Sequence, residues 1–112
     1  MQSLRDRNRK PTHGGAILRE DMLPVLNLTQ GELAVKLGVS RRTISEVLHE
    51  KRPITADMAI RIATLTNTTS QSWLNMQQAL DIWQLQQTNA KAYAQIERLA
   101  AWKKAHHLRK LP

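Results

Sequence analysis

The chain has 112 residues and a formal net charge of +8, with a sequence pI near 10.7. This length fits one small domain with a single core, and the charge favours an acidic partner such as nucleic acid or an anionic membrane. The absence of cysteine excludes disulfides and thiolate metal sites. No apolar run approaches the ~18 residues that a membrane span needs, and no signal core opens the chain, so we expect a cytoplasmic protein.

The positive charge gathers in both tails and around one central stretch. The net charge is +3 in residues 1–12, +2 in 40–53 and +5 in 89–112. Residues 1–12 have no sustained apolar period and are predicted to form a flexible basic arm. We therefore expect this arm, then a helical domain over 13–88, then a basic C-terminal helical extension over 89–112. Basic tails that only aid solubility remain an alternative.

From Gly15 onward, apolar residues recur at helical spacing and predict a first helix of about three turns. Its apolar positions are Ile17, Leu18, Met22, Val25 and Leu26. Pro24 falls within that run, so we expect the helix to kink or tighten near its end.

A second, short helix is predicted after Thr29, which forms a capping-box pattern with Glu32. Gly38 suits the left-handed turn that ends it. Ser40 is the expected N-cap of a third helix, which runs to about Leu48.

Three more helices complete the prediction, and no alternating run or hairpin signal indicates a strand. The first of them is capped by Thr55 and carries Met58, Ala59, Ile62, Ala63 and Leu65. A long helix from about Gln71 carries Trp73, Met76, Leu80 and Trp83. The last continues through Tyr93, Ile96, Leu99 and Trp102. The chain is therefore predicted to be all-α.

The twenty residues from Gln30 to His49 fit the spacing of a helix-turn-helix. That motif needs apolar residues at places four, eight, ten, fifteen and eighteen, a small residue at five and glycine at nine. These places hold Leu33, Leu37, Val39, Ile44, Val47, Ala34 and Gly38. The small residue allows two helices to cross closely, and glycine permits the turn between them. A DNA-binding motif is favoured over a merely structural helical corner.

The outward positions of the second motif helix become candidate DNA contacts, because the start of this helix enters the major groove. We predict DNA contacts from Gln30, Ser40, Arg41, Arg42, Thr43, Ser45, Glu46, Lys51 and Arg52. Arginine pairs with guanine O6 and N7, while lysines and arginines beyond the helix hold the backbone.

Two assignments within this set stay open. Arg41 and Arg42 differ by about 100° around the helix, so one is expected to read a base and the other to hold a phosphate. Glu46 is expected either to accept from cytosine N4 or to orient Arg42 one turn before it. For Lys51 and Arg52, the alternative to a contact with the DNA backbone is a position in a solvated loop.

The stretch from Leu28 to Trp83 resembles the HigA/VapI branch of the XRE (Cro/repressor-type) helix-turn-helix family, the antitoxins of plasmid-maintenance addiction modules. Two segments single out this branch: "KRPITADMAIRIA" and "WLNMQQALDIW". The second matches the family signature at Trp73, Leu74, Asn75, Gln77, Asp81 and Trp83. The family's opening "HPGEIL" is present as "HGGAIL" from His13. The resemblance implies a lambda-repressor-like domain of five to six helices.

It further implies a homodimer that binds a palindromic operator, represses its own operon and neutralises a RelE-like (HigB-type) mRNA endoribonuclease. A dimer that binds two half-sites is also expected on physical grounds, because one helix-turn-helix covers too few base pairs for selective binding. We assign part of the dimer interface to Trp73, Met76, Leu80 and Trp83. The alternative is that this stripe packs on the chain's own core.

The main rival is a stand-alone transcriptional regulator of the same family without a cognate toxin. No motif for catalysis, cofactor binding or metal binding stands out, so we expect no enzyme, no cofactor and no metal. The neighbours His106 and His107 do not share a helix face.

Overall fold

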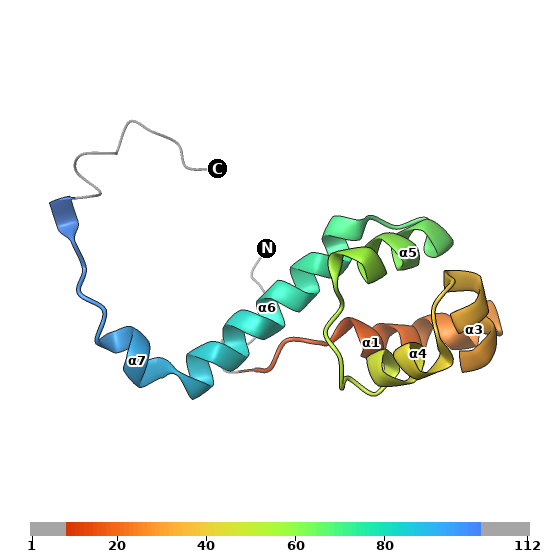
Figure 1. The fold of residues 1–112 in the computed structure, drawn as a ribbon, viewed down its shortest axis with the longest axis horizontal. Coiled ribbons are helices and arrows are strands. Elements are labelled where there is room, and N and C mark those ends of the chain that lie inside the picture. Colours follow the sequence, from red (N-terminus) through yellow and green to blue (C-terminus); the bar gives the residue numbers. More distant parts are fainter. Residues whose placement is uncertain (1–8, 102–112) are drawn as a thin grey trace.

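The computed structural model describes residues 9–101, and within that range it contains helices and no strand. The helices of the N-terminal two-thirds are α1 (Gly14–Ile17), η1 (Leu18–Met22), α2 (Leu23–Leu26), α3 (Gln30–Leu37), α4 (Arg41–Leu48) and α5 (Ala56–Thr66). They are followed by α6 (Ser70–Thr88) and α7 (Ala90–Ala94). In Figure 1, α1, α3, α4 and α5 gather at one end, and α6 runs from them towards α7. The all-α prediction is confirmed.

The first three elements form one continuous helix with a π-helical turn in its middle. In that turn the N–H of Leu23 bonds to the carbonyl oxygen of Leu18, five residues back. Pro24 lacks an N–H and its ring crowds the preceding turn, which a wider turn relieves. The sequence predicted a kink or a tightening near Pro24. The helix widens instead.

This wider turn also changes which side chains face the core. Val25 and Leu26, predicted on the apolar stripe, are 83% and 43% exposed. The extra residue in the π-turn rotates everything after it by about 100°. Leu23 packs against the core beside Met22, so Val25 and Leu26 do not share the buried face of this helix although their spacing matches it.

Local capping defines α3 as the sequence predicts. Thr29 Oγ1 accepts from the N–H of Glu32 at 3.1 Å, and Glu32 Oε1 accepts from the N–H of Thr29 at 2.9 Å. The hydrogen bond from the backbone N–H of Thr29 lowers the pKa of the Glu32 carboxyl. Gly38 ends the helix in the left-handed region with a φ of +73°.

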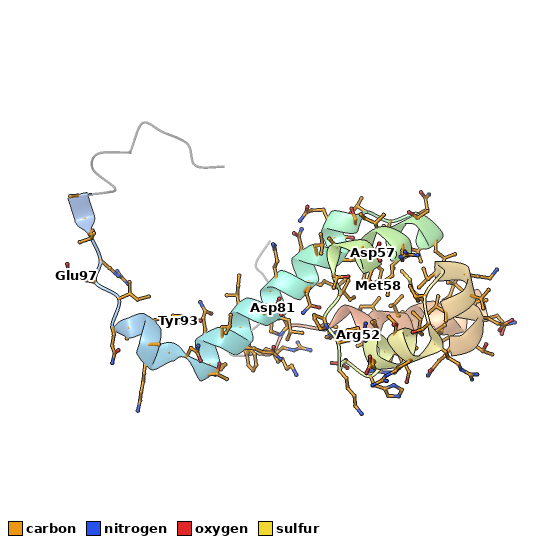
Figure 2. All side chains as sticks on the ribbon, viewed as in Figure 1. Arg52, Asp57, Met58, Asp81, Tyr93 and Glu97 are labelled. Carbon is orange, nitrogen blue, oxygen red and sulfur yellow. The ribbon has the colours of Figure 1, made fainter. Side chains whose placement is uncertain are left out.

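The core lies where α1, α3, α4, α5 and the start of α6 meet. It is built of apolar side chains from η1, α3, α4, the segment before α5, α5 and α6, with Ile17 of α1 packed against them, and its buried members are Leu18, Leu33, Ala34, Leu37, Ile44, Val47, Leu48, Ile54, Met58, Ala59, Ile62, Ala63 and Trp73. Figure 2 shows Met58 directed into this cluster. The predicted inward positions of the two motif helices are therefore confirmed.

The helix predicted through Trp102 is shorter in the structure. Helix α7 ends at Ala94, and residues 95–99 are not helical. Tyr93, Ile96 and Leu99 are 42%, 68% and 68% exposed, so the predicted apolar face packs against nothing that would stabilise a longer helix. Trp102 lies outside the described residues, as do residues 1–8 of the predicted arm.

Candidate nucleic-acid interface

Helix α4 has two sharply different faces. Its inner residues Ile44, Val47 and Leu48 have no exposed surface. Arg41 and Arg42 at its first turn are exposed, and Thr43, Ser45 and Glu46 are half-buried. The inner face fixes the helix in the core, and the outer face presents polar and cationic groups to solvent.

The hydroxyl groups at the start of α4 bond to each other and to the backbone. Ser40 Oγ accepts from the N–H of Thr43 at 3.0 Å and lies 2.8 Å from Thr43 Oγ1. This N-cap fixes where the helix begins. It therefore also fixes the direction in which Arg41 and Arg42 leave the helix.

Arg41 leans back over the neighbouring helix. Its Cζ and Nε lie 3.7 and 3.8 Å from the position that a Cβ on Gly31 would occupy. Gly31 and the half-buried Gln30 form the first turn of α3. The structure thus brings two of the predicted contact residues, Arg41 and Gln30, to one edge of the motif.

Glu46 joins α4 to the segment that follows it. Its Oε1 accepts from Arg52 Nη2 at 2.6 Å and Nε at 3.1 Å. Its Oε2 lies 3.6 Å from Arg42 Nε, one helical turn back. The hydrogen bonds from Arg52 lower the pKa of Glu46, with a smaller contribution from the charge of Arg42. Figure 2 shows Arg52 in the segment between α4 and α5.

That segment is also fixed from the other side by His13. The ring Nδ1 of His13 accepts from the N–H of Gly15 at 2.8 Å, so Nε2 carries the hydrogen and donates to the carbonyl oxygen of Arg52 at 3.0 Å. His13 is only 5% exposed. Lys51 precedes Arg52 in the sequence and is exposed.

Two arginines outside the motif donate to the carboxyl ends of its two helices. Arg19 Nη1 donates to the carbonyl oxygen of Leu48 at the end of α4. Arg61 Nη1 donates to the carbonyl oxygen of Leu37 at the end of α3, at 2.9 Å. Cations stabilise helix carboxyl ends, so both arginines support the geometry of the motif.

Sequence analysis missed both contacts. Arg61 also bonds Asp57 at 2.8 Å, an i, i+4 pair that the sequence contains. The contact from Arg19 spans 29 residues, and no local pattern predicts it.

The comparisons with known proteins agree with this geometry. A helix-turn-helix family model matches residues 25–73. An HTH-type transcriptional regulator of Haemophilus influenzae is 41% identical over 78 residues, covering 70% of this chain and 73% of that protein. Antitoxin HigA-1 of Vibrio cholerae is 34% identical over 80 residues, covering 71% and 75%. The chain belongs to the HigA-type antitoxins of the XRE helix-turn-helix family.

Solved structures of this family include complexes with DNA. Pseudomonas aeruginosa antitoxin HigA with the higBA promoter matches with a TM-score of 0.75 at 35% identity, covering 80% of this chain and 99% of that one. Antitoxin GraA in complex with its operator matches with a TM-score of 0.75 at 33% identity, covering 87% and 98%. The HigA-type fold of this chain is therefore one that relatives use to bind operator DNA.

The stripe predicted as a dimer interface divides into two parts on α6. Trp73 and Leu80 are 2% and 3% exposed, and Trp73 Nε1 donates to Thr68 Oγ1 at 2.8 Å. Met76 also packs against the core. Trp73 belongs to the core cluster and Leu80 is buried within the same chain, so neither presents surface to a partner. Trp83 is half-buried farther along the helix.

Between residues 9 and 101, no three His, Cys, Asp or Glu side chains lie close enough to hold a metal ion. In the same range, no helix is long and apolar enough to cross a membrane. His106 and His107 lie outside the described residues.

Proposed function

We propose that this HigA-type chain binds a palindromic operator as a homodimer and represses its own operon. The observation that carries the proposal is the asymmetry of α4, whose inner face is wholly buried while its first turn exposes two arginines. In this motif the second helix lies in the major groove and its first turn reaches base edges. The DNA complexes of the related HigA and GraA antitoxins support DNA binding by a protein of this fold.

The proposed DNA surface keeps the residues that the sequence predicted. It comprises Gln30, Ser40, Arg41, Arg42, Thr43, Ser45, Glu46, Lys51 and Arg52. The N-cap bond of Ser40 supports its role as a residue that fixes the start of α4. Exposed Lys51 supports a contact with phosphate, because no hydrogen bond or ion pair engages its ammonium group among the described residues.

The proposed dimer uses the outer half of α6. Ile82 and Leu85 there are 55% and 47% exposed, and Trp83 lies between them. Figure 1 shows this half of α6 extending beyond the cluster of the other helices. Burying these apolar side chains against a second copy would remove their surface from water. It would also pair two α4 helices for the two half-sites of an operator.

Neutralisation of a RelE-like endoribonuclease toxin is part of the same proposal. Its support is the likeness to Antitoxin HigA-1 and to the HigA structures. The alternative is a stand-alone regulator, and the HTH-type regulator of Haemophilus influenzae supports it. Co-expression with a neighbouring small basic gene product separates the two: relief of growth arrest indicates an antitoxin, and no relief indicates a regulator.

DNA binding is tested by fluorescence anisotropy with the DNA upstream of the gene and a shuffled duplex of equal composition. The double variant Arg41→Ala/Arg42→Ala should lose the preference for the upstream DNA and keep its melting temperature. A matched double variant, Lys91→Ala/Arg98→Ala, removes the same charge from exposed positions in and after α7, outside the proposed DNA surface, and should keep the preference. Unchanged preference in the Arg41/Arg42 variant would reject the proposed surface.

A further inference from the structure

We propose that Arg42 reads the base edge, that Arg41 holds the DNA backbone, and that Glu46 is a positioning residue for Arg42. This inference rests on the proposed function, since it divides the roles within the proposed DNA surface. The two arginines are neighbours in sequence, so their different surroundings in the fold decide the division.

The surroundings of Arg41 direct it towards the backbone. Its guanidinium lies beside Gly31, in the first turn of α3. When the second helix of this motif enters the major groove, the first helix crosses the DNA backbone. A guanidinium that follows α3 therefore comes to the phosphates at the rim of the groove, where it fixes register without reading sequence.

The surroundings of Arg42 leave its outer end open. The side chain is 86% exposed and leaves the first turn of α4. Its Nε lies 3.6 Å from Glu46 Oε2, and among the described residues its two terminal nitrogens make no hydrogen bond or ion pair. These two nitrogens form the fork that matches guanine O6 and N7. Arg42 therefore combines an inner nitrogen near Glu46 with two terminal donors on a solvent-exposed side chain.

Glu46 is poorly placed to read cytosine itself. Its Oε1 already accepts two hydrogen bonds from Arg52, and its Oε2 faces Arg42. The Glu46 side chain is only 29% exposed. Arg52 in turn is fixed through its carbonyl oxygen by His13. The chain from His13 through Arg52 and Glu46 to Arg42 thus connects the first helix to the proposed reading group.

The test uses a duplex selected from a random library by the wild-type protein, with each guanine of a half-site replaced in turn by 7-deazaguanine. This change removes the N7 acceptor and leaves base pairing intact. At one guanine the wild-type protein should lose affinity on the order of 10-fold. Arg42→Ala should be insensitive to the change at that guanine, while Arg41→Ala should bind all duplexes more weakly and keep the full loss.

The outcomes separate the inference from the function on which it rests. If no duplex is enriched, the proposed function fails. If selection succeeds but Arg42→Ala keeps the 7-deaza loss, or Arg41→Ala abolishes it, the division of roles is wrong. Both arginines are exposed, so thermal melts should show that both variants fold.

The role of Glu46 is tested with the same duplexes. Glu46→Ala should weaken discrimination at the guanine that Arg42 reads, and Glu46→Gln should restore part of it, because an amide oxygen still accepts from Arg42. Glu97→Ala removes the same charge from an exposed position outside the proposed DNA surface, so it is the matched control and should keep discrimination at that guanine. Relaxed preference at a cytosine, with the guanine preference unchanged, would instead assign base reading to Glu46 and overturn its positioning role.

Discussion

Gly15 of α1 lies directly against the backbone carbonyl oxygen of Val47 in α4, and the contact leaves no space for a side chain. A Cβ on Gly15 would overlap that oxygen, which belongs to the backbone and cannot rotate away. We expect Gly15→Ala to lower the free energy of unfolding by about 1–3 kcal/mol, as overpacking in a core does. The melting temperature should fall by roughly 4–8 °C for each kcal/mol.

Gly31→Ala is the matched control for this change. A Cβ there would lie 3.7 Å from its nearest neighbour, at ordinary van der Waals distance. Alanine is favoured over glycine within a helix by roughly 0.5–1 kcal/mol, so this variant should keep or raise the melting temperature. Equal melting temperatures for the two alanine variants would show that α1 can move away from α4 at little cost.

Gln77 joins α6 to the segment before α5 through a buried side chain. Its Oε1 accepts from the N–H of Ile54 at 2.8 Å, and its Nε2 donates to Asp81 at 2.9 Å. Gln77→Ala leaves the buried N–H of Ile54 without an acceptor, which we expect to cost about 1–3 kcal/mol of unfolding free energy. Urea denaturation measures the loss. The neighbouring Gln78→Ala removes an exposed side chain and should change stability little.

How much of this architecture the sequence predicts depends on the range of the interactions. The capping box of Thr29 and Glu32 and the turn at Gly38 follow from residues within one helical turn, and both were predicted. The exposure of Val25 was not, because a π-turn changes the register of everything beyond it. Helical spacing puts Trp73 and Leu80 on one apolar face of the helix. It does not show whether that face packs against the chain's own core or against a second copy.

In the candidate site, too, the sequence predicts local features and misses those that depend on residues far away in the chain. The outward residues of α4 follow from motif spacing, because the inner positions are determined by the core. The surroundings of those residues come from elsewhere in the chain: the contact of Arg19 with Leu48 spans 29 residues and that of His13 with Arg52 spans 39. Such contacts depend on how the helices pack, which periodicity does not describe.

The pair of Glu46 and Arg52 makes a prediction for acid titration. The hydrogen bonds from Arg52 lower the pKa of Glu46 below its ordinary value of 4.5. A lowered carboxyl pKa adds stability above the unfolded value, and that stability is lost as the pH falls through the folded value. Wild-type protein and Glu46→Gln should therefore differ most in melting temperature above pH 4.5 and converge in stronger acid.

NMR titration of the Glu46 carboxyl carbon tests the cause of this shift. Arg52→Met should raise the pKa of Glu46 towards 4.5, because it removes the hydrogen bonds that contribute most to the lowering. Lys51→Met removes a neighbouring charge that does not bond to Glu46 and should leave the lowered pKa in place. A pKa that stays low in Arg52→Met would assign the shift to Arg42 instead.

Lys51 should contribute to DNA affinity through charge alone. It is exposed next to Arg52, whose backbone His13 holds, so its ammonium group reaches solvent from a fixed position. If it meets one phosphate, Lys51→Ala should reduce the slope of log K against log salt by about 0.9 and weaken selected and random duplexes equally. Lys91→Ala removes the same charge from α7, far from α4 in Figure 1, and should leave the slope unchanged. A slope that falls equally in both variants would indicate that the C-terminal extension also lies along the DNA, and an unaltered slope in Lys51→Ala would mean that this lysine is only solvated.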